Sequence, residues 1–138
     1  MQTIIGLGQA GCRIAECFKR HSQYSVIKID VGLEKSKNVF SLKRQSSPEL
    51  YEENIPYDIG TSLQREVKSE TLFITSCGNI SGAALAILEK IKDNTKISIM
   101  YIIPQKDDLF GDKKLQNNLL FNVFQEYSRS AAIERVFL

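Results

Sequence analysis

The stretch TIIGLGQAGCRIAECFKR, residues 3–20, decides the fold of this 138-residue chain. TIIGLG begins as a short apolar strand that ends at glycine. AGCRIAECFKR, residues 10–20, has helical spacing, with apolar side chains gathered on one face: Ile14, Ala15, Cys17 and Phe18. SVIKID at 25–30 has the composition of a second strand. The first thirty residues therefore predict a strand–helix–strand unit.

The turn inside this unit, GLGQAG at 6–11, has the spacing G-x-G-x-x-G. Gly6 and Gly8 permit dihedral angles and close approaches that a β-carbon would block. The amides that open the following helix have no intrahelical partners, and they lie at the positive end of the helix dipole. The turn therefore predicts a phosphate site. No lysine follows at Walker A spacing, so the turn is not a P-loop.

Asp30 lies 19 positions after Gly11, at the end of the second expected strand. Dinucleotide-binding domains place an acidic residue there to hold a ribose hydroxyl. Taken alone, this pattern favours NAD or FAD. The alternative interpretation is that the glycines serve only a tight turn and close packing of helix on sheet.

The rest of the chain alternates in the same way. Further strands are expected at 71–76, 96–103 and 134–138, and further helices at 61–70, 83–93 and 112–130. A cap at Thr61 or Ser62 would begin the first of these helices. Residues 32–58 are polar and irregular, which predicts a long loop. This order predicts an α/β fold in one domain, 1–138, a three-layer Rossmann-like parallel sheet of about five strands with helices on both faces.

A second glycine turn, CGNISG at 77–82, follows the strand expected at 71–76. Gly78 and Gly82 flank Asn79 and Ser81, whose side chains can donate hydrogen bonds beside the amides of the next helix. Both turns would emerge at carboxyl ends of parallel strands, where ligands bind. If the two strands are neighbours, the turns face one pocket.

This pair of turns resembles the nucleotide-binding domain of the tubulin and FtsZ superfamily. GQAGCRI at 8–14 is similar to the tubulin loop GQCGNQI, with Gly8, Gln9, Gly11 and Ile14 in register. SCGNISGAA at 76–84 falls where the family has GGGTGSGAA, and the matching residues are Gly78, Ser81, Gly82, Ala83 and Ala84. Ser76, Cys77, Asn79 and Ile80 depart from that signature. The resemblance covers nearly the whole chain and is weakest at 33–70.

The resemblance implies binding of GTP or GDP, with Mg²⁺ where the family uses it, and self-association into a filament or larger assembly. The implied nucleotide contacts are Gly8, Gln9, Ala10, Gly11, Cys12, Asp30, Gly78, Asn79, Ser81 and Gly82. The family's base-contacting helix and catalytic acidic residues follow the fifth strand, near Leu138, so we expect little hydrolysis by this chain alone. Any GTPase activity would need a longer or assembled form. Small phage and bacterial relatives exist in this family, and a viral chain would work in the host cytoplasm.

Two residues of the second turn, Ile80 and Gly82, bear on whether it binds a nucleotide phosphate. Ile80 adds a branched side chain where the family brings backbone close to phosphate, so the ligand either sits differently or binds weakly. Gly82 is expected to face phosphate, and we expect Gly82→Val to leave the fold largely intact. Two alternatives stay open: a Rossmann domain that binds NAD or FAD, and a structural or interaction module without a nucleotide.

Composition excludes several classes of function. A net charge of +2 is too small to indicate nucleic acid or a membrane surface, and the basic cluster Lys35, Lys37, Lys43 and Arg44 is expected to be a solvated loop. Three cysteines and one histidine give little support to a metal site and suggest a cytoplasmic protein with free thiols. Cys17 and Cys77 are expected to be small buried side chains, and His21 and the Asp107–Asp108 pair to be solvated. The longest apolar stretch, ISIMYII, is too short to span a bilayer.

Overall fold

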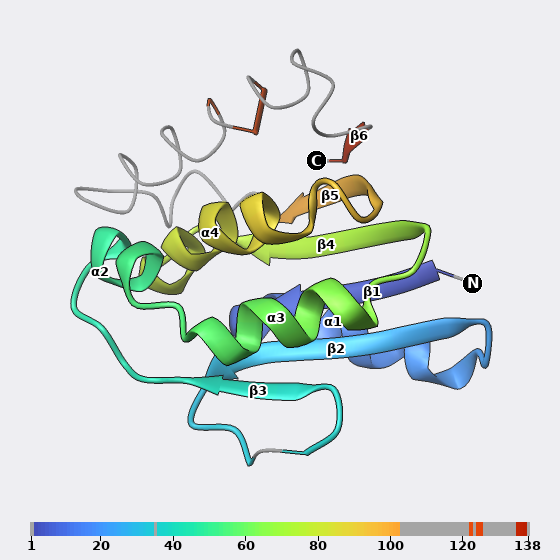
Figure 1. The fold of residues 1–138 in the computed structure, drawn as a ribbon, viewed down its shortest axis with the longest axis horizontal. Coiled ribbons are helices and arrows are strands. Elements are labelled where there is room, and N and C mark those ends of the chain that lie inside the picture. The colour runs from blue at the N-terminus through green and yellow to red at the C-terminus, as the bar shows by residue number, and fades with distance from the viewer. Residues whose placement is uncertain (1, 35, 103–121, 123, 126–134, 138) are drawn as a thin grey trace.

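The computed structural model describes residues 2–34, 36–102, 122, 124–125 and 135–137. They include a six-stranded sheet in the order β3-β2-β1-β4-β5-β6, with every neighbouring pair parallel (Figure 1). The strands are β1 Gln2–Leu7, β2 Tyr24–Val31, β3 Val39–Leu42, β4 Glu70–Ser76, β5 Lys96–Ile102 and β6 Arg135–Phe137. The α-helices are α1 Gly8–Cys17, α2 Pro48–Glu53, α3 Tyr57–Glu66 and α4 Gly82–Ile91. Two 3₁₀ helices, η1 Phe18–Arg20 and η2 Asn79–Ser81, adjoin α1 and α4.

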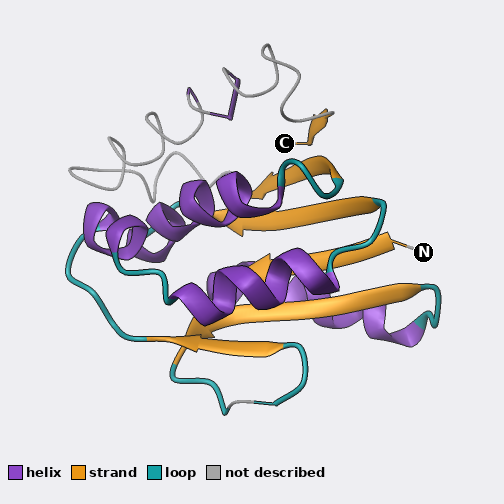
Figure 2. Ribbon diagram, viewed as in Figure 1, coloured by secondary structure: helices purple, strands orange, loops and turns teal. Residues whose placement is uncertain are grey.

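Helices cover both faces of the sheet (Figure 2). Alternate side chains of each strand point to opposite faces, and β1 shows this directly. Ile4 packs with Ala15 of α1 in one apolar cluster. Ile5 and Leu7 pack in a second cluster with Leu63 of α3 and with the apolar face of α4. The predicted three-layer Rossmann-like α/β fold is therefore confirmed.

Helix α1 packs on the sheet through very small residues. Gly8, Gly11 and Ala15 are its buried positions, and they recur at helical spacing. Cys17 is exposed, and its thiol donates to the carbonyl of Arg13 at 3.6 Å. The expectation that Cys17 is buried was therefore wrong, because residue 17 lies on the face of α1 opposite the small residues that contact the sheet.

The segment 32–58 is more regular than its polar composition indicates, and the expectation of one long loop was wrong. It contains β3, which lies at one edge of the sheet and was not predicted. β3 pairs in parallel with β2 from Lys28↔Val39 to Val31↔Leu42. It also contains α2, whose Tyr51 is buried. The side-chain oxygen of Ser47 caps α2 by accepting from the amide of Leu50 at 3.3 Å.

Helix α3 begins earlier than expected. It starts at Tyr57, directly after Pro56, so neither Thr61 nor Ser62 is its cap. The Thr61 hydroxyl instead donates to the carbonyl of Tyr57 at 3.1 Å within the helix. Ile59 and Leu63 are buried against the same face of the sheet as α4.

The described residues after Ile102 agree with the elements predicted from the sequence. β6 confirms the expected last strand, and Asn122, Phe124 and Gln125 are helical, within the helix expected at 112–130. Most of that helix, together with Asp107 and Asp108, lies outside the described residues. The ring of Phe124 packs edge-to-face on Tyr101 of β5 at 5.6 Å between centroids. Within the part of the chain that is described, no helix has the length and apolar character needed to cross a membrane.

Candidate functional site

The two glycine turns emerge side by side at the carboxyl edge of the sheet. β1 and β4 are parallel neighbours, from Gln2↔Glu70 to Gly6↔Ile74, and each strand runs directly into its turn. The condition for the two turns to lie close together, that these strands are neighbours, is therefore met. The order of the sheet also changes direction between β1 and β4, which is where open α/β sheets bind ligands.

The glycines of the first turn have separate structural reasons. Gly8 has φ +77°, a conformation that side-chain-bearing residues rarely adopt. A β-carbon on Gly6 would lie 2.4 Å from the carbonyl oxygen of Gly11, and one on Gly11 would lie 2.4 Å from the carbonyl oxygen of Ile74. The backbone of α1 therefore lies so close to β1 and β4 that neither position has room for a β-carbon. Tight packing thus accounts for Gly6 and Gly11 whether or not a ligand binds.

The amino-terminal end of α1 is open. Leu7 occupies its N-cap position and has no side-chain oxygen with which to satisfy the first amides. Gln9 is exposed and Ala10 is half-buried, so this first turn reaches the surface. The arrangement leaves backbone donors and the positive end of the dipole available to an anion.

Cys12 faces the sheet. Its single S–H lies within hydrogen-bond distance of two carbonyl oxygens, those of Gly6 at 3.4 Å and Ile29 at 3.5 Å, so the thiol contacts both β1 and β2. Burial raises the pKa of the Cys12 thiol from 9.0 to about 11, and the nearby charge of Asp30 adds to this effect. Cys12 is therefore a protonated packing residue, and its position within α1 does not support the implied nucleotide contact.

Asp30 lies across from the first turn. The pairing of Leu7 with Ile29 brings Asp30 level with Gly8 on the neighbouring strand. One carboxylate oxygen, Oδ1, accepts a hydrogen bond from the amide of Val31 at 2.7 Å, and the residue is half-buried. This position matches the acidic residue that contacts ribose in dinucleotide-binding domains.

The second turn uses its donors within the protein. The Ser81 hydroxyl and the Ser81 amide both donate to the carbonyl of Gly78, and the amide of Gly82 donates to carbonyls at the start of η2. The Asn79 side-chain amide donates to the carbonyl of Ser46 at 3.4 Å. The amino-terminal end of α4 therefore differs from that of α1, because the amide of its first residue, Gly82, already donates to carbonyls of η2.

Gly82 is required by packing against α2. Its backbone is ordinary helix, with φ −58°. A β-carbon there would lie 1.9 Å from the carbonyl oxygen of Pro48, which is far inside contact distance. The expectation that the fold tolerates Gly82→Val was therefore wrong. The space in front of Gly82 holds the first residue of α2.

Sequence reasoning missed α2, although a signal was present. Ser47 followed by Pro48 and Glu49 is typical of a helix start, with serine as the cap, proline in the first turn and an acidic residue near the positive dipole end. Nothing in the spacing of the segment indicates that it packs on the second turn.

Neither a metal-binding cluster nor a match to a known protein identifies the ligand of this site. The described residues bring no three His, Cys, Asp or Glu side chains together in a way that could hold a metal ion. The fold and the paired turns define the class of the protein as a Rossmann-like α/β domain. No protein-family model matches the chain, and no curated protein matches it either.

Proposed function

We propose that the chain binds a nucleotide through the amino-terminal end of α1, as a domain similar to the nucleotide-binding domain of tubulin and FtsZ. The observation that carries the proposal is the open end of α1 at the point where the strand order reverses. The second turn lies directly beside it, since a β-carbon on Gly8 would be 3.1 Å from Cγ2 of Ile80.

In this proposal the phosphates contact the amides of Gln9 and Ala10, which precede the first intrahelical hydrogen bond of α1, and Asp30 contacts the ribose. Gly8 lets the backbone approach the phosphates, and the exposed Gln9 side chain adds a donor. The second turn contributes less than in the family, because Ile80, η2 and α2 fill the space in front of α4. The resemblance in GQAGCRI and SCGNISGAA supports GTP or GDP, with Mg²⁺, as the ligand.

The same resemblance supports self-association into a filament or larger assembly in a cytoplasm, of the kind formed by phage and bacterial relatives of the family. Hydrolysis is not part of the proposal for these 138 residues. Sedimentation of the chain with and without GTP tests assembly separately from binding.

A second candidate is an NAD-binding Rossmann domain. It is favoured by the strand order β3-β2-β1-β4-β5-β6, which is the order of dinucleotide-binding domains, and by Asp30 at the end of β2. A third candidate, an interaction module without a nucleotide, is favoured by the internally occupied donors of the second turn.

Calorimetric titration with GTP, GDP, ATP and NAD, each with Mg²⁺, separates the three candidates. The proposal predicts that GTP and GDP bind and that ATP and NAD bind at least tenfold more weakly, a difference of about 1.4 kcal/mol. Tighter binding of NAD supports the dinucleotide domain. Failure of all four to bind at millimolar concentration supports the interaction module and contradicts the proposal.

A further inference from the structure

A polar hollow lies far from the glycine turns, beside the part of β2 that extends past β3, and it is lined from the α1 side by Lys19 and from the α3 side by Glu66. Its volume is about 460 Å³, within the range of small-molecule sites. It lies toward the amino-terminal ends of the strands and includes Tyr24 and Ser25 at the start of β2. Ser25 and Asp30 are five residues apart on one strand, a separation of about 17 Å. The hollow is therefore separate from the proposed nucleotide site.

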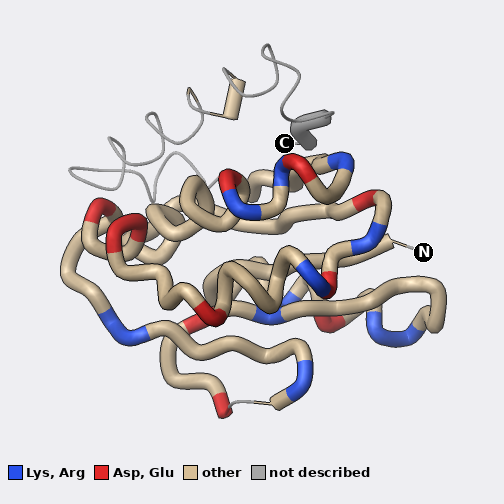
Figure 3. The backbone as a smooth tube through the Cα atoms, in the orientation of Figure 1, with Lys and Arg blue, Asp and Glu red and all other residues tan. Residues whose placement is uncertain are grey.

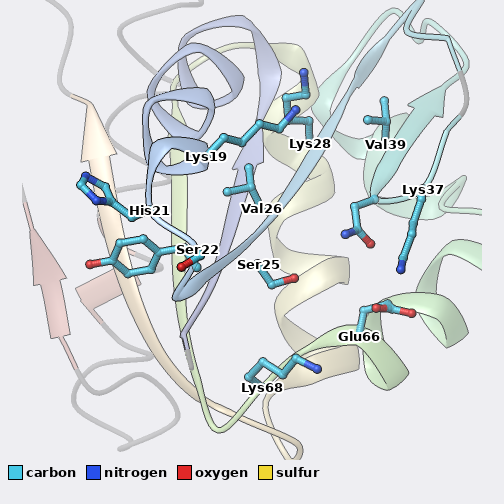
Figure 4. A pocket seen from close by; sticks show the side chains of 12 residues that line it. Lys19, His21, Ser22, Ser25, Val26, Lys28, Lys37, Val39, Glu66 and Lys68 are labelled. Carbon is cyan, nitrogen blue, oxygen red and sulfur yellow. The ribbon is translucent and has the colours of Figure 1, made fainter.

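Four lysines from four different segments line this hollow (Figure 4). Lys19 comes from η1 and Lys28 from β2, while Lys37 precedes β3 and Lys68 precedes β4. Figure 3 shows basic positions in each of these segments. In Figure 4, Lys19 and Lys28 lie above Ser25, Lys68 lies below it, and Lys37 lies to its right, above Glu66.

The lysines outnumber the carboxylates near them. Lys19 and Lys28 share a single carboxylate, that of Glu16, at 3.1 and 3.0 Å. These two contacts hold the pKa of Glu16 below its usual value, so this carboxylate stays charged. Glu66 is the acidic residue in the lining, and within the described part of the chain no ion pair joins it to Lys37 or Lys68. The four lysines and the two carboxylates of Glu16 and Glu66 together carry a net charge of +2. This local excess equals the net charge of the whole chain.

The backbone around the hollow is fixed by hydrogen bonds. The amide of Lys28 donates to the carbonyl of Asn38 at 3.0 Å, and Asn38 itself is held at φ +66°. The amide of Lys68 donates to the hydroxyl of the buried Thr3 at 2.8 Å. The segments that carry the lysines are thereby tied to β1 and β2, and the hollow is built into the sheet.

We propose that this hollow binds a small molecule that carries two or more phosphate groups. Lysine ammonium groups bind phosphate as point charges. Their positions on both sides of Ser25 suit separated phosphates better than a single one. Ser25 and Asn38, which also line the hollow, add neutral hydrogen-bond donors to the four ammonium groups. A hollow of this limited volume favours a compact anion over a long polymer, which would need an extended basic surface.

Titration with sodium tripolyphosphate tests the proposal. The double variant Lys37→Ala/Lys68→Ala should bind at least tenfold more weakly than the natural chain, a change of about 1.4 kcal/mol. The control Lys92→Ala/Lys96→Ala removes the same charge from two exposed residues, one directly after α4 and one at the start of β5, that do not line the hollow. It should bind within about twofold of the natural chain, since exposed charges act weakly at a distance.

Amide chemical shifts locate the bound tripolyphosphate. The proposal predicts shifts at Ser25 and Asn38. Shifts confined to Gln9, Ala10 and Gly11 would assign the anion to α1 and overturn the proposal without affecting the proposed nucleotide site. Equal weakening in both double variants, no binding at millimolar concentration, or tighter binding of a single-stranded oligonucleotide would also overturn it.

Discussion

Ile80 of the second glycine turn lies directly over Gly8 of the first: a β-carbon on Gly8 would be 3.1 Å from Cγ2 of Ile80. The two turns therefore touch, and a branched side chain fills the space between them. Ile80 is half-buried and packs against the apolar cluster on the α4 side of the sheet. This contact sets how closely a phosphate can approach both turns at once.

Shortening Ile80 should open this space. We expect Ile80→Ala to tighten binding of GDP by about threefold to tenfold, or roughly 0.7–1.4 kcal/mol, because phosphate could then approach the backbone of both turns. Leu85→Ala is the matched control, since Leu85 is also half-buried against the same cluster but lies within α4. Calorimetry on both variants measures the effect. Weaker binding in Ile80→Ala alone would show that Ile80 supports the site.

Gln9 should contribute directly to binding. It is exposed in the first turn of α1, so Gln9→Ala leaves packing unchanged and removes one hydrogen-bond donor. We expect the loss to weaken nucleotide binding by roughly 1–2 kcal/mol, the value for a hydrogen bond to a charged group. Gln23→Ala, an exposed glutamine just before β2, should have no effect. Equal affinities for the two variants and the natural chain would remove Gln9 from the site.

Gly82 should be intolerant of even one added carbon. Gly82→Ala places a β-carbon 1.9 Å from the Pro48 carbonyl oxygen, so α2 must move, and we expect a loss of about 1–3 kcal/mol in the free energy of unfolding. Gly60→Ala is the control, because a β-carbon in α3 would meet only the flexible Lys90 side chain at 3.4 Å. That change should be neutral or stabilise the helix by about 0.5–1 kcal/mol. Urea denaturation of both variants compares them, and equal stabilities would argue against the α2–α4 packing.

Cys12 should make stability depend on alkaline pH. Its folded-state pKa of about 11 lies above the ordinary value of 9.0, so the unfolded chain releases the proton first. The stabilising contribution is fully present below pH 9 and is lost as the pH rises to about 11. Burial also raises the pKa of Tyr101, which acts in the same direction at higher pH.

Denaturation curves across this range test the contribution of Cys12. The free energy of unfolding should fall less steeply in Cys12→Ala than in the natural chain. Cys17→Ala, which changes an exposed thiol, should follow the natural chain. Parallel curves for all three proteins would show that Cys12 is not the titrating group.

The sequence predicted the parts of the fold that depend on local patterns. The strand–helix alternation is strong in β1, α1, β2, β4, α4 and β5, and parallel connection then places both turns at the same edge of the sheet. That the two turns are neighbours follows from the strand order, in which β1 pairs with β4. β3 was missed because Val39–Leu42 is only four residues long and lies among polar residues. Its pairing with β2 is a long-range interaction that no local pattern indicates.

The candidate site was predicted less completely. The glycine spacing identified the open end of α1, because that geometry is local. It did not indicate that Pro48 would pack on Gly82 or that Asn79 would bind the carbonyl of Ser46. Both contacts join segments more than thirty residues apart. The roles of Gly82 and Asn79 could therefore be seen only in three dimensions.

The most direct test of the central claim is an NMR titration of the natural chain with GDP and Mg²⁺. The proposed site predicts saturable shifts in the amides of Gln9, Ala10 and Gly11. Saturable binding without any change at Gln9, Ala10 and Gly11, or the absence of binding at millimolar GDP, would contradict the account.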